Sequence, residues 1–163
     1  MTIAAAESAE PTTGSTSGPI DVEFGHIEHV PVYFDDLDPM GIVHNARYAV
    51  LLERGLSTYW AARGHSFKEG RPSSPDVIHA VRELTITFHA PIRGTGQVAA
   101  HFWFNHFGTT SAEYGFRLLS TDGCQVHAEG RRTIVRIDPV TMRPTAWSDA
   151  LRAIAPALLR PSA

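Results

Sequence analysis

The sequence has 163 residues, of which 43% are hydrophobic and 19% are charged, and its formal net charge is -3 at pH 7. This length fits one domain with a sizeable core, and the charge leaves no basic field for nucleic acid and no polybasic patch for a membrane surface. No apolar run approaches the roughly 20 residues of a membrane-spanning helix. Cys124 is the only cysteine, so an internal disulfide is excluded and a cytoplasmic location is expected.

The first twenty residues differ in composition from the rest of the chain. They are rich in Ala, Ser, Thr, Gly and Pro, and they lack the positive start and the apolar centre of a secretory signal. We therefore expect a disordered leader over residues 1–20, followed by a single domain over residues 21–163.

The longest patterned stretch of the domain begins with a strand and continues into a helix. Alternating apolar residues predict a strand over residues 25–34. Pro39 and Gly41 then mark a sharp turn. From Val43 to Arg63 the apolar residues recur at helical spacing, which predicts one long helix that ends at Gly64.

The rest of the chain reads mainly as strands with short turns, after a polar loop over residues 65–75. Runs rich in β-branched and aromatic residues predict four strands, at 77–91, 97–107, 111–119 and 124–137. A short terminal helix is predicted over residues 151–159. One helix against a twisted five-stranded antiparallel sheet is an α+β arrangement, and its uncovered sheet edges favour a partner chain.

Asp38 is the strongest candidate for a reacting side chain. It stands immediately before the turn, so it should lie near the N-terminus of the long helix. A helix N-terminus offers unpaired N–H groups and about half a positive charge. A carboxylate beside it suits attack on a carbonyl, in which an oxyanion develops. The alternative is a simple capping or turn role, since Asp is common at such positions.

The segment DPMGIVHNARY, residues 38–48, resembles the active-site segment of hot-dog-fold acyl-CoA thioesterases of the 4-hydroxybenzoyl-CoA thioesterase type. That family has an aromatic strand, a D-x-x-G-x-V motif, and a helix with a Tyr or Phe and an E-R pair. The matching residues are Tyr33, Asp38, Gly41, Val43, Tyr48, Glu53 and Arg54. The resemblance, which extends to Pro144, implies a hot-dog fold with one central helix wrapped by five strands. It also implies a homodimer, often a dimer of dimers (a homotetramer), with the active site at the subunit interface.

The resemblance further implies hydrolysis of an acyl-CoA or acyl carrier protein thioester to a free acid and a thiol. Asp38 would act as general base or as nucleophile. The backbone N–H of Asn45 would stabilise the oxyanion, with Gly41 allowing a close approach. His44 would hydrogen-bond substrate or water, or would only cap the helix locally.

Four more residues are predicted to line the substrate site. Tyr48 would wall the acyl pocket or the core. Glu53 would serve as a second acid, or as a structural partner of Arg54 or of a neighbouring strand. Thr110 and Ser111 resemble a G-x-[ST]-S run that lines the thioester pocket in the family, and a plain hairpin turn fits them equally well.

Other functions remain open at this level. No cofactor or metal site is predicted, because the nine histidines do not show the ligand spacing of zinc sites. A hot-dog hydratase or dehydratase of enoyl or hydroxyacyl thioesters would use His44 beside Asp38. A non-catalytic thioester-binding protein would use Asp38 structurally. Four aromatic side chains either favour an aromatic or medium-chain acyl group or simply pack in the core, as most core aromatic residues do: Trp60, Phe102, Trp103 and Phe104.

Overall fold

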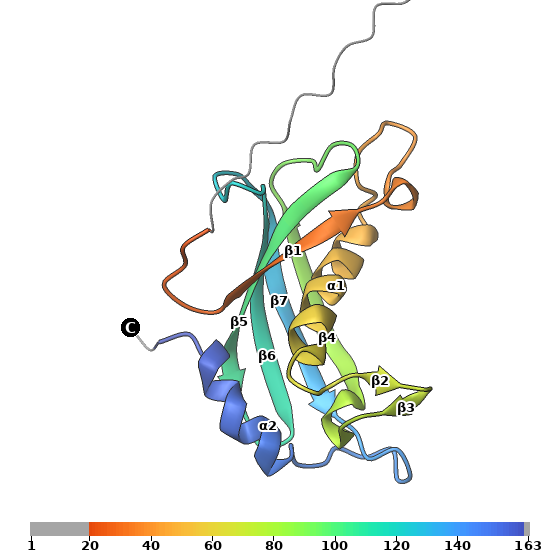
Figure 1. Ribbon diagram of the computed structural model, residues 1–163, viewed down its shortest axis with the longest axis vertical. Helices are drawn as coiled ribbons and strands as arrows, with labels where there is room; N and C mark the ends of the chain where they lie inside the picture. The colour runs from red at the N-terminus through yellow and green to blue at the C-terminus, as the bar shows by residue number, and fades with distance from the viewer. Residues whose placement is uncertain (1–19, 162–163) are drawn as a thin grey trace, which may run out of the picture.

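The computed structural model describes residues 20–161, so that residues 1–19 of the expected leader lie outside the described residues. Its main sheet is antiparallel, with the strand order β1-β5-β6-β7-β4, and the helix α1 lies along one face (Figure 1). The five strands are β1 (His26–Val32), β4 (His79–Phe88), β5 (Gly96–Phe107), β6 (Ser111–Leu119) and β7 (Val126–Arg136). The predicted five-stranded α+β architecture is confirmed.

The helix α1 (Arg47–Ala61) provides one side of the core. It packs mainly against β1 and also contacts β5 and β6. Its buried apolar residues meet three fully buried aromatic rings of the sheet, Phe102, Phe104 and Phe116. The inner face of β4, at the far edge of the sheet, remains largely exposed.

The helix begins four residues later than the sequence predicts. Val43 forms an isolated β-bridge with Leu37, and its N–H donates to the carbonyl of Ile92 at 2.9 Å. The N–H of His44 likewise donates to the carbonyl of Asp36 at 2.9 Å. These bonds hold the backbone in a loop conformation, so the apolar pattern over these residues reflects loop packing and not a first helical turn.

The smaller elements also differ in part from the prediction. The predicted loop at residues 65–75 contains a short hairpin, formed by β2 (Phe67–Lys68) and β3 (Arg71–Pro72). The terminal helix α2 spans Asp149–Ile154, and a 3-10 turn follows it. It starts earlier than predicted because the Ser148 hydroxyl caps it by accepting the N–H of Leu151. Within residues 20–161, every helix falls short of the length and apolarity that crossing a membrane requires.

The two edges of the main sheet have different characters. β1 contains Pro31, which lacks a backbone donor, and Glu28 and His29 add polar side chains. β4 contains no proline and shows Val81, Leu84 and Phe88 to solvent at 48%, 38% and 51% exposure. The β1 edge is therefore poorly suited to pairing with another strand, whereas the β4 edge is open to such pairing.

Candidate active site

An open pocket of about 400 Å³ lies where the loop before α1 meets the segment after β4. We call it the outer pocket. Of the eight site residues that the sequence predicts, Asp38, His44, Asn45 and Tyr48 line it together. The remaining lining residues are Ile42, Val43, Phe88, His89, Ala90 and Pro91.

The carboxylate of Asp38 is held at one oxygen. Its Oδ1 accepts the N–H groups of Met40 at 2.8 Å and Ile42 at 3.3 Å. Oδ2 makes no hydrogen bond with any residue between 20 and 161. The half-buried side chain is therefore oriented by its own turn, and one oxygen stays available to a water or a substrate.

Gly41 closes the turn that begins at Asp38. Its φ of 72° lies in the left-handed region, and its N–H donates to the carbonyl of Asp38 at 2.9 Å. A Cβ at this position would meet no atom within 4 Å, so the glycine is needed for backbone conformation and not for space. Its carbonyl accepts the N–H of Gly94 at 2.9 Å, which ties the turn to the segment after β4.

His44 and Asn45 lie between this turn and the helix. The His44 Nδ1 accepts the N–H of Ala46 at 3.2 Å, and the His44 carbonyl accepts the N–H of Arg47 at 2.8 Å. His44 therefore makes the local cap that was one of its two expected roles. The backbone N–H of Asn45 has no hydrogen-bond acceptor within the described part of the chain. It precedes the helix by two residues and remains a free donor at the outer pocket.

Tyr48 forms a buried wall of the outer pocket. Its ring meets Phe88 edge-on at 4.9 Å between centroids, and its hydroxyl accepts the N–H of Ile92 at 3.3 Å. The hydroxyl thus fastens the segment after β4 to the first turn of α1.

The other predicted site residues lie elsewhere in the protomer. Glu53 forms an ion pair of 2.5 Å with Arg132 of β7, and Arg54 has a different partner. Thr110 and Ser111 lie at the hairpin between β5 and β6, at the opposite end of the sheet from the loop before α1 (Figure 1). One protomer therefore does not bring these three residues to the outer pocket.

A buried ion pair, which sequence reasoning missed, anchors the loop that carries Asp38. Both carboxylate oxygens of Asp36 bind the guanidinium of Arg54, at 2.6 Å and 3.0 Å, and the N–H of Tyr33 adds a bond of 2.8 Å. Burial acts to raise the pKa of Asp36, but the hydrogen bonds from Arg54 and Tyr33 outweigh it and bring the pKa below its ordinary value. Asp35, Asp36 and Asp38 are close in sequence, and nothing in their spacing marks the buried one.

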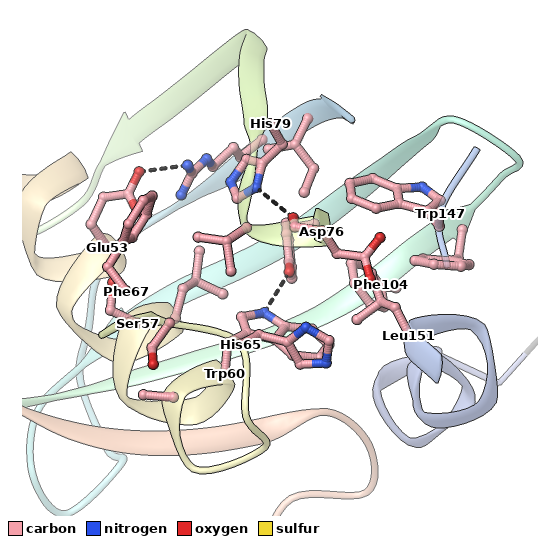
Figure 2. Close-up of a pocket in the computed structure, with 18 residues that line it drawn as sticks. Glu53, Ser57, Trp60, His65, Phe67, Asp76, His79, Phe104, Trp147 and Leu151 are labelled. Carbon is pink, nitrogen blue, oxygen red and sulfur yellow. Dashed lines mark hydrogen bonds and ion pairs between the residues drawn. The ribbon is translucent and has the colours of Figure 1, made fainter. Parts of the chain in front are cut away.

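A second cavity of about 350 Å³ lies between the C-terminal half of α1, the sheet and α2; we call it the inner cavity. Figure 2 shows Glu53 and Ser57 on one side and Trp147 and Leu151 on the other. Arg132 of β7, the partner of Glu53, is only 4% exposed here. The aromatic lining residues are Trp60, Phe67, Phe104, Phe107, Tyr114 and Trp147.

Two polar atoms at the inner cavity lack partners. The Nδ1 of His65 and the Nε1 of Trp147 are buried and make no hydrogen bond with any residue that the structure describes. His79, which also lines the cavity, has a pKa lowered from its ordinary value because desolvation disfavours the charged ring. Among the described residues, no three His, Cys, Asp or Glu side chains gather in a way that would hold a metal ion.

Comparison with known proteins identifies the family. The thioesterase superfamily matches residues 40–127, which include Gly41 of the turn, the helix α1 and the strands β4, β5 and β6. The acyl-CoA thioester hydrolase YbgC of Escherichia coli is 26% identical over 117 residues, covering 72% of this chain and 85% of that protein. The putative acyl-CoA thioesterase YneP of Bacillus subtilis is 20% identical over 123 residues, covering 76% and 87%.

Solved structures share the fold. The PA5185 protein of Pseudomonas aeruginosa superposes with a TM-score of 0.74 at 23% identity, covering 86% of this chain and 96% of that one. A thioesterase of Thermus thermophilus, solved with coenzyme A and Zn, has a TM-score of 0.63 at 24% identity, covering 83% and 96%. The predicted hot-dog fold is confirmed, and the chain belongs to the thioesterase superfamily of thioester hydrolases.

Proposed function

We propose that this chain hydrolyses acyl-CoA thioesters in the outer pocket, with Asp38 as the reacting carboxylate and the Asn45 N–H as the oxyanion donor. The observation that carries the proposal is that Asp38 and Asn45 line one pocket, and that Oδ2 of Asp38 and the N–H of Asn45 have no hydrogen-bond partner among the described residues. The names of YbgC and YneP, which give them as an acyl-CoA hydrolase and a putative one, support the choice of substrate.

The chemistry needs no further strong acid. Asp38 either takes a proton from a water that attacks the thioester carbon, or attacks that carbon itself to form an anhydride that water then opens. In both routes the carbonyl oxygen becomes negative, and a preorganised N–H donor stabilises it. The carbon–sulfur bond then breaks, and the thiolate leaves without needing prior protonation.

We further propose that two copies of the chain pair through β4. A twofold axis normal to the sheet joins the two edges antiparallel and keeps both helices on the same face. The partner helix would then cover the inner-face side chains of β4, which α1 leaves exposed: Val81, Leu84 and Phe88. Such a pair buries both open edges at once, and a further pairing of dimers would give the homotetramer that the family resemblance implies.

Replacing Leu84 by Glu is expected to convert the dimer into monomers. Leu84 lies near the middle of β4, so two introduced carboxylates would meet close to the twofold axis and repel each other. Within the protomer the change is tolerable because Leu84 stands opposite Arg132 on β7. Light scattering during size-exclusion chromatography measures the mass. Val140→Glu is the matched control, since Val140 is 89% exposed and lies outside β4; equal masses for both variants would contradict the pairing.

The test of the function is an assay on a panel of acyl-CoA thioesters in which free thiol is followed. Hydrolysis that is lost in Asp38→Asn and retained in His44→Ala supports the proposal. Hydration of an enoyl-CoA without thiol release would instead indicate a hydratase, and binding without either reaction would indicate a non-catalytic protein. Supplying the same acyl groups on acyl carrier protein shows which carrier the enzyme accepts.

A further inference from the structure

We infer that the inner cavity receives the acyl group of the thioester, and that Trp147 and Leu151 set the limit on its length. This inference rests on the proposed function and on the pairing through β4. It assigns acyl groups of up to about twelve heavy atoms, since a water-sized group occupies about 30 Å³ in a liquid and the cavity measures about 350 Å³.

The first argument is the character of the cavity. Its volume lies within the range of pockets that bind small molecules. Six aromatic side chains line it, together with aliphatic residues such as Leu56, Ile134 and Leu151. Glu53, Asp76, His79 and Arg132 also border the cavity, but most of its lining is apolar, so it offers an apolar guest a mainly apolar surface.

The second argument is Trp147 itself. This side chain is 3% exposed, yet its Nε1–H has no hydrogen-bond acceptor among residues 20–161. A buried donor without an acceptor costs about 1–3 kcal/mol, which a phenylalanine would avoid with a smaller ring. The larger indole narrows the cavity more than a phenylalanine would, and this fits a side chain that limits the space for a guest.

The third argument is the position along the chain of the two walls of the cavity. Trp147 and Leu151 belong to the segment around α2, which lies beyond the residues 40–127 that match the thioesterase superfamily. The other wall, with Glu53 and Ser57 of α1, lies inside the matched region (Figure 2). The wall formed by Trp147 and Leu151 therefore lies outside the residues that match the family model, and we place the limit on acyl length at this wall.

The fourth argument is the route between the two sites. In one protomer they lie at opposite ends of α1, a helix about 22 Å long for its 15 residues. β4 borders both, because Phe88 lines the outer pocket and His79 lines the inner cavity. Antiparallel pairing brings the Phe88 end of one β4 beside the His79 end of its copy. A thioester held at Asp38 of one subunit would then direct its acyl group into the inner cavity of the partner.

The test is the chain-length profile of hydrolysis, measured as kcat/KM for saturated acyl-CoAs from butanoyl to hexadecanoyl. For the native enzyme we expect kcat/KM to fall at least about tenfold between dodecanoyl-CoA and hexadecanoyl-CoA, because the longer chain exceeds the cavity. In Trp147→Ala the ratio of kcat/KM for hexadecanoyl-CoA over octanoyl-CoA should rise at least about tenfold. Leu151→Trp should move the optimum toward shorter chains, which covers the case that Trp147→Ala does not fold.

Trp103→Ala is the matched control. Trp103 is 6% exposed and packs edge-on against Phe24, away from the inner cavity, so its loss should lower stability without changing the profile. An unchanged profile in both Trp147→Ala and Leu151→Trp would overturn the inference. If Asp38→Asn still abolished hydrolysis, that result would leave the proposed function standing. If Trp103→Ala shifted the profile in the same way, the inference about the inner cavity would also be overturned, because a general loss of stability would then explain the change.

Discussion

Replacing Asp38 by Asn is expected to lower kcat for acyl-CoA hydrolysis by at least about 100-fold, the usual scale for the loss of a general base. The amide cannot take a proton from water and is a poor nucleophile. Its oxygen can still accept the N–H groups of Met40 and Ile42, so the turn should keep its shape. The measurement is thiol release at saturating substrate, with thermal unfolding of both proteins recorded alongside.

The matched control for this change is Asp35→Asn. Asp35 is an exposed carboxylate of the same loop, and its side chain makes only a 3.4 Å contact with Arg47. It should leave kcat within a few-fold of the native value. A kcat for Asp38→Asn that stays within tenfold of the native value would remove Asp38 from the reaction. Turnover in ¹⁸O-labelled water, followed by mass spectrometry of the enzyme, reports on the route, because label enters the Asp38 carboxylate only through an anhydride.

The strands of this fold were predictable because each carries its own signal. Alternation or a β-branched run marks every strand of the sheet, and Asp122-Gly123 marks a tight turn. The start of α1 was not predictable in this way. Val43 continues the apolar spacing of the helix, and only the bonds of Val43 and His44 to Ile92 and Asp36 hold these two residues in a loop. Those partners are set by tertiary structure, which local periodicity does not contain.

For the candidate site too, local patterns in the sequence predicted some features, and others depend on tertiary structure. Asp38, Asn45 and Tyr48 were found because they lie within eleven residues, so one motif contains them all. For Glu53 a neighbouring strand was one of the expected partners, and Arg132 of β7 is that partner. The inner cavity joins side chains from α1, the sheet and α2, which are far apart in sequence. No pattern along the chain indicates that these residues lie together, so the cavity could be found only in the three-dimensional structure.

The second large effect is expected from Asp36→Ala, which should lower the free energy of unfolding by about 3 kcal/mol. The change removes a fully buried carboxylate and leaves Arg54, whose side chain is 22% exposed, without its bidentate partner. Because water still reaches part of the guanidinium, we place the effect at the lower end of the range for a broken buried pair. Urea unfolding followed by circular dichroism measures it. Asp35→Ala, at an exposed site, should stay within about 0.5 kcal/mol of the native protein.

The same pair predicts a dependence on pH. The folded protein holds the pKa of Asp36 below its ordinary value, so the unfolded chain binds the proton first as the pH falls. The stabilisation is therefore fully present above the ordinary pKa of about 4 and is lost as the pH falls through the folded pKa. The difference in unfolding free energy between the native protein and Asp36→Ala should be constant near neutral pH and should shrink below about pH 4. A difference that stayed the same at acid pH would mean that Asp36 acts through packing and not through its charge.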